Sequence, residues 1–92
     1  MGTAIVTLTI MPESPEIDLE AIKTKVAGLV REFAGDRDTK VTIEPVAFGL
    51  NAIKYIFVMD ENLGSPDVVA EKVDALEGVQ SAEVSDVRRA VG

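Results

Sequence analysis

The chain has 92 residues, of which 16 are acidic and 9 are basic, and it contains no His, Cys or Trp. This length fits one domain with one hydrophobic core. Without Cys or His, the chain has no disulfide, thiolate nucleophile, zinc-finger site or imidazole base. The formal net charge of −7 argues against broad attraction to nucleic acid or to an anionic membrane, because both favour surfaces rich in Lys and Arg. These exclusions leave a small acidic domain that works by contact.

The first third of the chain predicts a strand followed by a helix. Residues 3–11 alternate between apolar and polar side chains, which is typical of a half-buried strand, and Pro12 ends it. Asp18 is placed to cap a helix that Gly35 ends. The apolar side chains of this helix recur at helical spacing and form a stripe broad enough to cover a sheet: Leu19, Ile22, Val26, Leu29, Val30 and Phe33.

The middle of the chain predicts two further strands joined by a short hairpin link. Residues 40–44 alternate, with Val41 and Ile43 expected to point inward. Pro45 bounds this strand, which places it at an edge of the sheet, since proline lacks the N–H that a central strand needs. Residues 50–59 are apolar on both sides and therefore predict a central strand.

The last third predicts a second helix and a last strand. Ser65 and Pro66 are typical of the cap and the first residue of a helix, and Gly78 is expected to end it in a left-handed conformation. The apolar stripe of this helix is Val69, Val73 and Leu76. The last strand is expected over residues 79–87, with residues 88–92 as a tail.

The resulting order, strand–helix–strand–strand–helix–strand, predicts an α+β fold of the ferredoxin-like βαββαβ type. Right-handed crossovers place both helices on one face of a four-stranded antiparallel sheet. The spatial order of the strands is then 4-1-3-2. In that order the second strand lies at an edge and the third in the centre, which agrees with the proline and with the apolar pattern.

Carboxylates are plentiful, but their positions favour structural roles. Most of them lie in loops and at helix starts, where capping and solvation explain them, and no partner base or nucleophile stands out beside them. Asp60-x-Asn62-x-Gly64 resembles part of a calcium loop but lacks the closing bidentate Glu, so we interpret it as a turn. The glycines match neither the dinucleotide nor the nucleoside-triphosphate loop spacing.

Two features of the sequence leave alternatives open. Phe48 lies next to Gly49 at the expected hairpin tip, where it either folds back onto the core or stands out as an interface anchor. Arg88 and Arg89 are the only adjacent cations of the chain, and they form either a solvated tail or cations that reach an anionic or metal-binding site on a partner. In a sheet of the expected order these features lie at opposite ends, about 25 Å apart for strands of about eight residues.

Several segments resemble translation elongation factor 1-beta of the short archaeal type, in the same order and over essentially the whole chain. The most specific are the Pro-x-Ala-Phe-Gly-Leu segment of residues 45–50 and the Glu-Val-x-Asp-Val-Arg-Arg pattern of residues 83–89. The others are Met11-Pro12-Glu13-Ser14-Pro15, Asp18-Leu19-Glu20, Ala52-Ile53-Lys54 and Gly78-Val79.

This resemblance implies a guanine-nucleotide exchange factor for elongation factor 1-alpha, the GTPase that delivers aminoacyl-tRNA to the ribosome. In eukaryotic relatives, an aromatic residue at the position of Phe48 contacts the GTPase, and a lysine near the carboxyl end enters the magnesium region of its nucleotide site. Arg89 takes the place of that lysine here, with Arg88 as the alternative one residue earlier. We therefore expect Phe48, Gly49, Arg88 and Arg89 to bind the partner.

The remaining expectations concern assembly and location. We expect one exchange domain over residues 1–92, a monomer when not bound to the GTPase, with no cofactor or metal of its own and no covalent chemistry. The absence of a targeting pattern, and a longest apolar run of only residues 55–59, favour a cytoplasmic protein that contacts neither membrane nor nucleic acid directly. The alternative is a ferredoxin-like regulatory module that binds a small molecule between copies paired along an edge strand; an enzyme is a more distant third.

Overall fold

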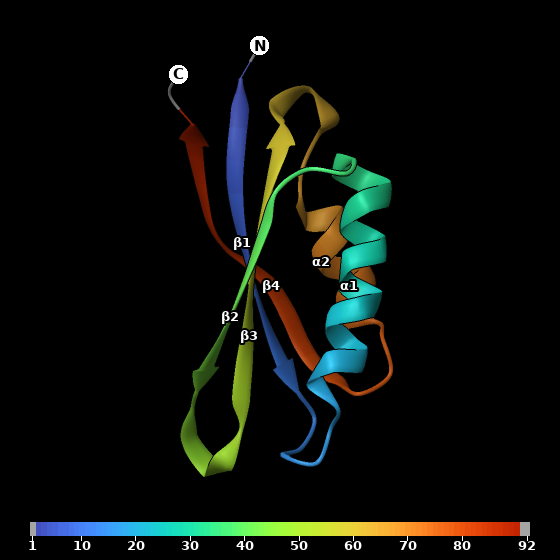
Figure 1. Ribbon diagram of the computed structural model, residues 1–92, viewed down its shortest axis with the longest axis vertical. Helices are drawn as coiled ribbons and strands as arrows, with labels where there is room; N and C mark the ends of the chain where they lie inside the picture. Colours follow the sequence, from blue (N-terminus) through green and yellow to red (C-terminus); the bar gives the residue numbers. More distant parts are fainter. Residues whose placement is uncertain (1, 91–92) are drawn as a thin grey trace.

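The computed structural model describes residues 2–90 as a four-stranded antiparallel sheet with two helices on one face (Figure 1). The strands lie in the order β2-β3-β1-β4, which confirms the predicted ferredoxin-like arrangement. The elements along the chain are β1 (Thr3–Pro12), α1 (Leu19–Ala34), β2 (Thr39–Pro45), the 3₁₀ turn η1 (Ala47–Gly49), β3 (Asn51–Asp60), the 3₁₀ turn η2 (Glu61–Leu63), α2 (Asp67–Asp74) and β4 (Val79–Ala90).

Helix α1 begins and ends where its capping residues predict. The Oδ1 atom of Asp18 accepts hydrogen bonds from the backbone N–H groups of Glu20 at 3.0 Å and Ala21 at 3.4 Å. At the other end, Gly35 adopts a φ of 86° and its N–H donates to the carbonyl of Arg31 at 2.9 Å. Within residues 2–90, no helix is long and apolar enough to cross a membrane.

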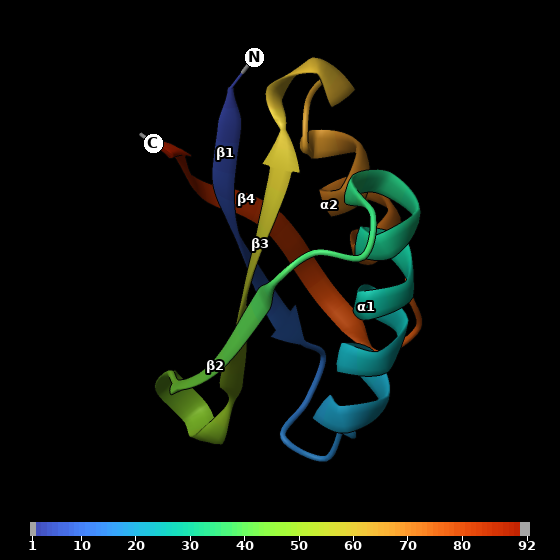
Figure 2. The same ribbon diagram turned by 45° about the horizontal axis from the view of Figure 1, so that its top comes forward.

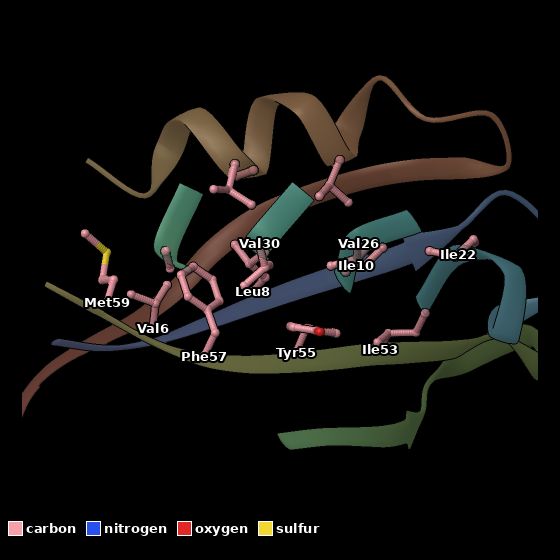
Figure 3. Packing of buried hydrophobic residues seen from close by; sticks show 14 of the residues in the cluster. Val6, Leu8, Ile10, Ile22, Val26, Val30, Ile53, Tyr55, Phe57 and Met59 are labelled. Carbon is pink, nitrogen blue, oxygen red and sulfur yellow. The ribbon is translucent and has the colours of Figure 1, made fainter. Parts of the chain in front are cut away.

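The hydrophobic core lies between the helices and the covered face of the sheet (Figure 3). Strand β1 supplies its centre, because every second side chain of this strand points toward the helices. The labelled core residues of Figure 3 are Val6, Leu8, Ile10, Ile22, Val26, Val30, Ile53, Tyr55, Phe57 and Met59. All of them are at most 3% exposed, so the core holds the central strands rigidly in place.

The open face of the sheet is polar along its centre, as the alternation of β1 predicts. Lys54 Nζ donates to Oγ1 of Thr9 at 3.0 Å, and the Thr9 hydroxyl donates to Oγ of Ser85 at 2.8 Å. Ser85 lies at a register shift of β4, between the residues that pair with Thr7 and Leu8. These side-chain bonds connect three strands across the face that no helix covers.

Strand β2 is at the edge of the sheet, as predicted, and Val41 and Ile43 point toward the covered face as expected, but neither side chain is buried. Register places both residues on the helix-covered face, opposite Tyr55 and Ile53 of β3. Nevertheless Val41 is 37% and Ile43 41% exposed, and every residue of β2 is exposed. The helices pack over the other three strands, while β2 and its hairpin extend away from α1 (Figure 2).

The end of α2 also differs from the prediction, because the helix stops at Asp74 rather than beside Gly78. Two further turns follow, in which Leu76 N–H donates to the carbonyl of Val73 and Val79 N–H to that of Leu76. Gly78 does adopt the expected left-handed conformation, with a φ of 89°. A Cβ there would lie 3.3 Å from Cγ2 of Ile17, so this glycine serves a close packing contact as well as a turn.

Candidate partner-binding surfaces

Phe48 stands out from the protein at the tip of the β2–β3 hairpin. Phe48 lies in η1, and its side chain is 93% exposed. Of the two positions that the sequence leaves open for this ring, the one folded back onto the core is therefore wrong. Its backbone has a φ of 62° and a ψ of 28°, a left-handed conformation that costs a non-glycine residue about 1–2 kcal/mol. An exposed aromatic ring on a strained backbone is a typical functional feature.

Gly49 completes the turn that presents Phe48. Its φ is 75°, so two consecutive residues have the positive φ that a type I′ hairpin turn requires. The N–H of Leu50 donates to the carbonyl of Ala47 at 3.3 Å and closes the turn. The nearest heavy atom to a Cβ at Gly49 would be Cγ of Pro15 at 4.0 Å, so the backbone conformation, not crowding, requires glycine here.

Further apolar side chains are exposed on the same hairpin. Val46 is 38% exposed directly before η1, and the β2 residues Val41 and Ile43 add to it. Exposed apolar surface on a projecting hairpin is a common feature of protein–protein contacts. The hairpin therefore presents one highly exposed aromatic ring together with smaller, partly exposed apolar side chains.

The structure contradicts the expectation that Arg88 and Arg89 form a tail. Both lie inside β4, which continues to Ala90, and they pair with Ile5 and Ala4 of β1. Strand β4 extends beyond Val87 because β1 offers backbone partners as far as Thr3. The expected tail residues Val91 and Gly92 lie outside the described residues.

The two arginines point to opposite faces of the sheet. Arg89 shares the helix-covered face with the buried Ala4, whereas Arg88 shares the open face with the exposed Ile5. Each Nε atom donates to a carboxylate: Arg88 to Oδ2 of Asp86 at 2.9 Å, and Arg89 to Oε2 of Glu61 at 2.7 Å. Both side chains remain at least 75% exposed, so a partner can reach them.

Phe48 and the two arginines lie at opposite ends of the molecule, as the sheet order predicts. The hairpin tip is at the bottom of Figure 1 and the end of β4 is at the top. The longest dimension of the molecule is 42 Å, against 21 and 18 Å for the other two. The structure therefore offers two separate surfaces rather than one site.

Sequence reasoning missed Glu61 as a candidate, because it interpreted this residue as part of a turn. The turn is present as η2, but the Glu61 carboxylate lies against Arg89, which is 28 positions away in the sequence. No sequence motif joins these two residues. The signal that could have found the pair is the antiparallel pairing of β1 with both β3 and β4, which places the end of β3 near the end of β4.

None of the acidic side chains within residues 2–90 is buried. Within residues 2–90, no three His, Cys, Asp or Glu side chains gather as they would around a metal ion. An open depression of about 410 Å³ between α2 and β4 is lined by Asp67, Glu71, Asp74 and Glu83. One of these carboxylates has a structural role, since Oδ1 of Asp74 accepts from the N–H of Ala82 at 3.1 Å.

Comparison with known proteins finds one family model and several relatives that match nearly the whole chain. The family model described as "EF-1 guanine nucleotide exchange domain" matches residues 5–90. The chain is 39% identical to "Elongation factor 1-beta" of Methanothermobacter thermautotrophicus over 89 residues, which is 97% of this chain and 98% of that protein. Proteins of the same name from Methanococcus maripaludis (39% over 90 residues) and Methanosphaerula palustris (34% over 87 residues) match at least 95% of both chains.

Proposed function

The chain belongs to the elongation factor 1-beta family, and from this premise we propose that it promotes GDP release from elongation factor 1-alpha during translation elongation. The family match over residues 5–90 carries this conclusion. It also leaves the alternative of a small-molecule-binding regulatory module without support. The exposed Phe48 and the two exposed arginines supply the contacts that such a protein needs.

The mechanism we propose is differential binding without covalent chemistry. An exchange factor binds the nucleotide-free GTPase more tightly than the nucleotide-bound form. Thermodynamic reciprocity then requires that the factor lower the affinity of the GTPase for nucleotide by the same ratio. A rigid sheet with groups presented at both ends suits this task, because it can hold one region of the partner while displacing another.

The hairpin supplies the holding contact. Phe48 is 93% exposed, so burying its ring in a pocket of the GTPase contributes binding energy that the isolated protein does not use. Gly49 fixes the turn that aims the ring outward. The strain at Phe48 is already present before binding, so the anchor is preorganised.

The end of β4 supplies the displacing contact. Of the two candidate cations, we assign Arg89 to the magnesium region of the GTPase and Arg88 to a supporting contact on the open face. A guanidinium placed near Mg²⁺ repels the metal and offers hydrogen bonds to the oxygen atoms that the metal otherwise holds. Losing the metal removes its bridge to the phosphates and weakens GDP binding.

The separation of the two surfaces sets a requirement for the partner. A protein that contacts both ends has to extend along the 42 Å dimension of the sheet, which favours a GTPase of more than one domain. The net charge of −7 also favours a basic face on the partner, because complementary charge speeds association. We place this complex in the cytoplasm, with the exchange factor a monomer before it binds, and with no nucleic acid or membrane contact of its own.

Calorimetric titration of elongation factor 1-alpha with this protein tests the proposal. The expected result is tight one-to-one binding to the nucleotide-free GTPase and at least tenfold weaker binding to the GDP-bound form. Equal affinity for the two forms would refute the proposal, since a ligand that binds two states equally shifts nothing. Size-exclusion chromatography of the protein alone checks the expected monomer.

A further inference from the structure

Glu61 and Arg89 form an ion pair in which the carboxylate is much less exposed than the guanidinium. Arg89 Nε donates to Oε2 of Glu61 at 2.7 Å, yet the Arg89 side chain is 75% exposed. The Glu61 side chain is less exposed, at 30%. Within residues 2–90 this is the one hydrogen bond of the Arg89 guanidinium, so the described part of the chain leaves the donors of its terminal Nη groups available.

The backbone directly before β1 holds Glu61 in place. The N–H of Glu61 donates to the carbonyl of Gly2 at 2.9 Å. The Glu61 carboxylate rests directly on Gly2, because a Cβ added to that glycine would collide with Oε1. The residue before β1, the turn after β3 and the end of β4 are thus connected through Glu61.

From this arrangement we infer that Glu61 is a positioning residue for the exchange reaction. It fixes Nε of Arg89 and so directs the Nη groups outward as a ready pair of donors. Such a pair matches two oxygen atoms of a carboxylate or a phosphate, the groups that surround a nucleotide-bound magnesium ion. The inference rests on the function proposed above and deepens it: it adds the carboxylate that directs Arg89 toward the partner.

The expected effect follows from the flexibility of an unheld arginine. Without Glu61 the Arg89 side chain samples many rotamers, and ordering it on the partner reduces affinity by about two- to tenfold. Glu61→Ala is therefore expected to weaken binding to nucleotide-free elongation factor 1-alpha, and to slow stimulated GDP release at subsaturating factor, by that ratio. Glu61→Gln keeps an oxygen atom that accepts from Nε and is expected to stay within about twofold of the unmodified protein.

A matched control separates positioning from loss of charge. Glu20 forms an ion pair of the same length, 2.7 Å, with Lys23 on the surface of α1. Glu20→Ala removes the same charge from an exposed pair and is expected to leave GDP release unchanged. A two-dimensional ¹H–¹⁵N spectrum supplies a readout besides activity: the Arg89 Nε–H signal, identified by its loss in Arg89→Ala, should shift in Glu61→Ala and remain nearly in place in Glu61→Gln.

The outcomes distinguish the inference from the function on which it rests. Unchanged release with Glu61→Ala, faster release, or an equal loss with Glu61→Gln would each overturn the positioning role, while leaving the exchange function standing. An Nε–H signal that does not respond to Glu61→Ala would also overturn it. If the unmodified protein fails to stimulate release, the exchange function fails, and the spectrum still reports whether Glu61 holds Arg89.

Discussion

Phe48 and Arg89 lie at opposite ends of a molecule whose longest dimension is 42 Å, one on the β2–β3 hairpin and the other near the end of β4. Strand β3 begins just after the hairpin and runs to η2, whose Glu61 contacts Arg89. A single central strand therefore connects the hairpin of the exposed Phe48 to the residue that contacts Arg89. Because the two surfaces are far apart, a mutation in one should leave the other unchanged.

Phe48→Ala should weaken binding to nucleotide-free elongation factor 1-alpha by about 30-fold, the effect of losing an aromatic anchor worth about 2 kcal/mol. The free energy of unfolding should hardly change, because the ring is 93% exposed and contributes little to the core. Calorimetric titration measures the affinity and urea denaturation measures the stability. Val68→Ala, which truncates a 44% exposed apolar residue on α2, serves as the control and should leave the affinity as it is.

Arg89→Ala should reduce stimulated GDP release while changing the stability of the exchange factor by less than about 1 kcal/mol, because its ion pair with Glu61 is exposed to solvent. Stopped-flow measurement with a fluorescent GDP detects the loss. Lys25→Ala removes a positive charge from the exposed side of α1 and should behave like the unmodified protein. An equal loss in both variants would indicate that overall charge, and not Arg89, governs exchange.

The effects of Phe48→Ala and Arg89→Ala on binding should add in free-energy terms. Residues this far apart, with no contacting residue in common, usually give additive changes within about 0.5 kcal/mol. A double-mutant cycle on the affinity for the nucleotide-free GTPase measures the coupling. A coupling free energy well above about 0.5 kcal/mol would contradict independent contacts and would indicate that binding at one end changes the other.

Gly49→Ala should destabilise the protein by about 1–2 kcal/mol, because alanine is strained at a φ of 75°. Steric crowding does not contribute, since the nearest atom to the new Cβ lies 4.0 Å away. Gly28→Ala is the matched control: this glycine lies in the middle of α1 with no heavy atom within 4 Å of an added Cβ, and the change should stabilise by about 0.5–1 kcal/mol. Urea denaturation of both variants measures the free energy of unfolding, which should fall for Gly49→Ala and rise for Gly28→Ala.

Ile43 and Ile53 face each other across β2 and β3, yet truncating them should have very different effects. Ile53→Ala should reduce stability by about 2–5 kcal/mol, because its side chain is fully buried. Ile43→Ala should cost about 1 kcal/mol or less, since that side chain is 41% exposed. Comparable losses by thermal or urea denaturation would show that the helices cover β2 more completely than this structure has them.

The fold could be predicted from the sequence because local signals and global pattern agree. Asp18 and Gly35 bound α1 by capping chemistry that acts within one turn, and the alternation of β1 distinguishes its two faces. The errors occur where distant parts of the chain decide the outcome. The burial of Val41 depends on whether a helix reaches the edge strand, and alternation alone carries no such information.

The candidate site was predictable only in part, for the same reason. Phe48 and Gly49 could be identified as a hairpin tip from their immediate neighbours, but the exposure of the ring depends on the three-dimensional path of the hairpin. The sequence singles out Arg88 and Arg89 as adjacent cations, and the family resemblance selects Arg89, whereas its place in a strand follows from pairing with Ala4 at the other end of the chain. Its contact with Glu61 could not be inferred from the sequence, since it joins the turn after β3 to the end of β4, which only the folded sheet brings together.

The release of a fluorescent GDP from elongation factor 1-alpha, followed by stopped flow in the presence of excess unlabelled nucleotide, tests the exchange function most directly. The account predicts that catalytic amounts of this protein accelerate release, with a rate that rises with its concentration and saturates. A release rate that stays at its intrinsic value across that concentration range would contradict the account.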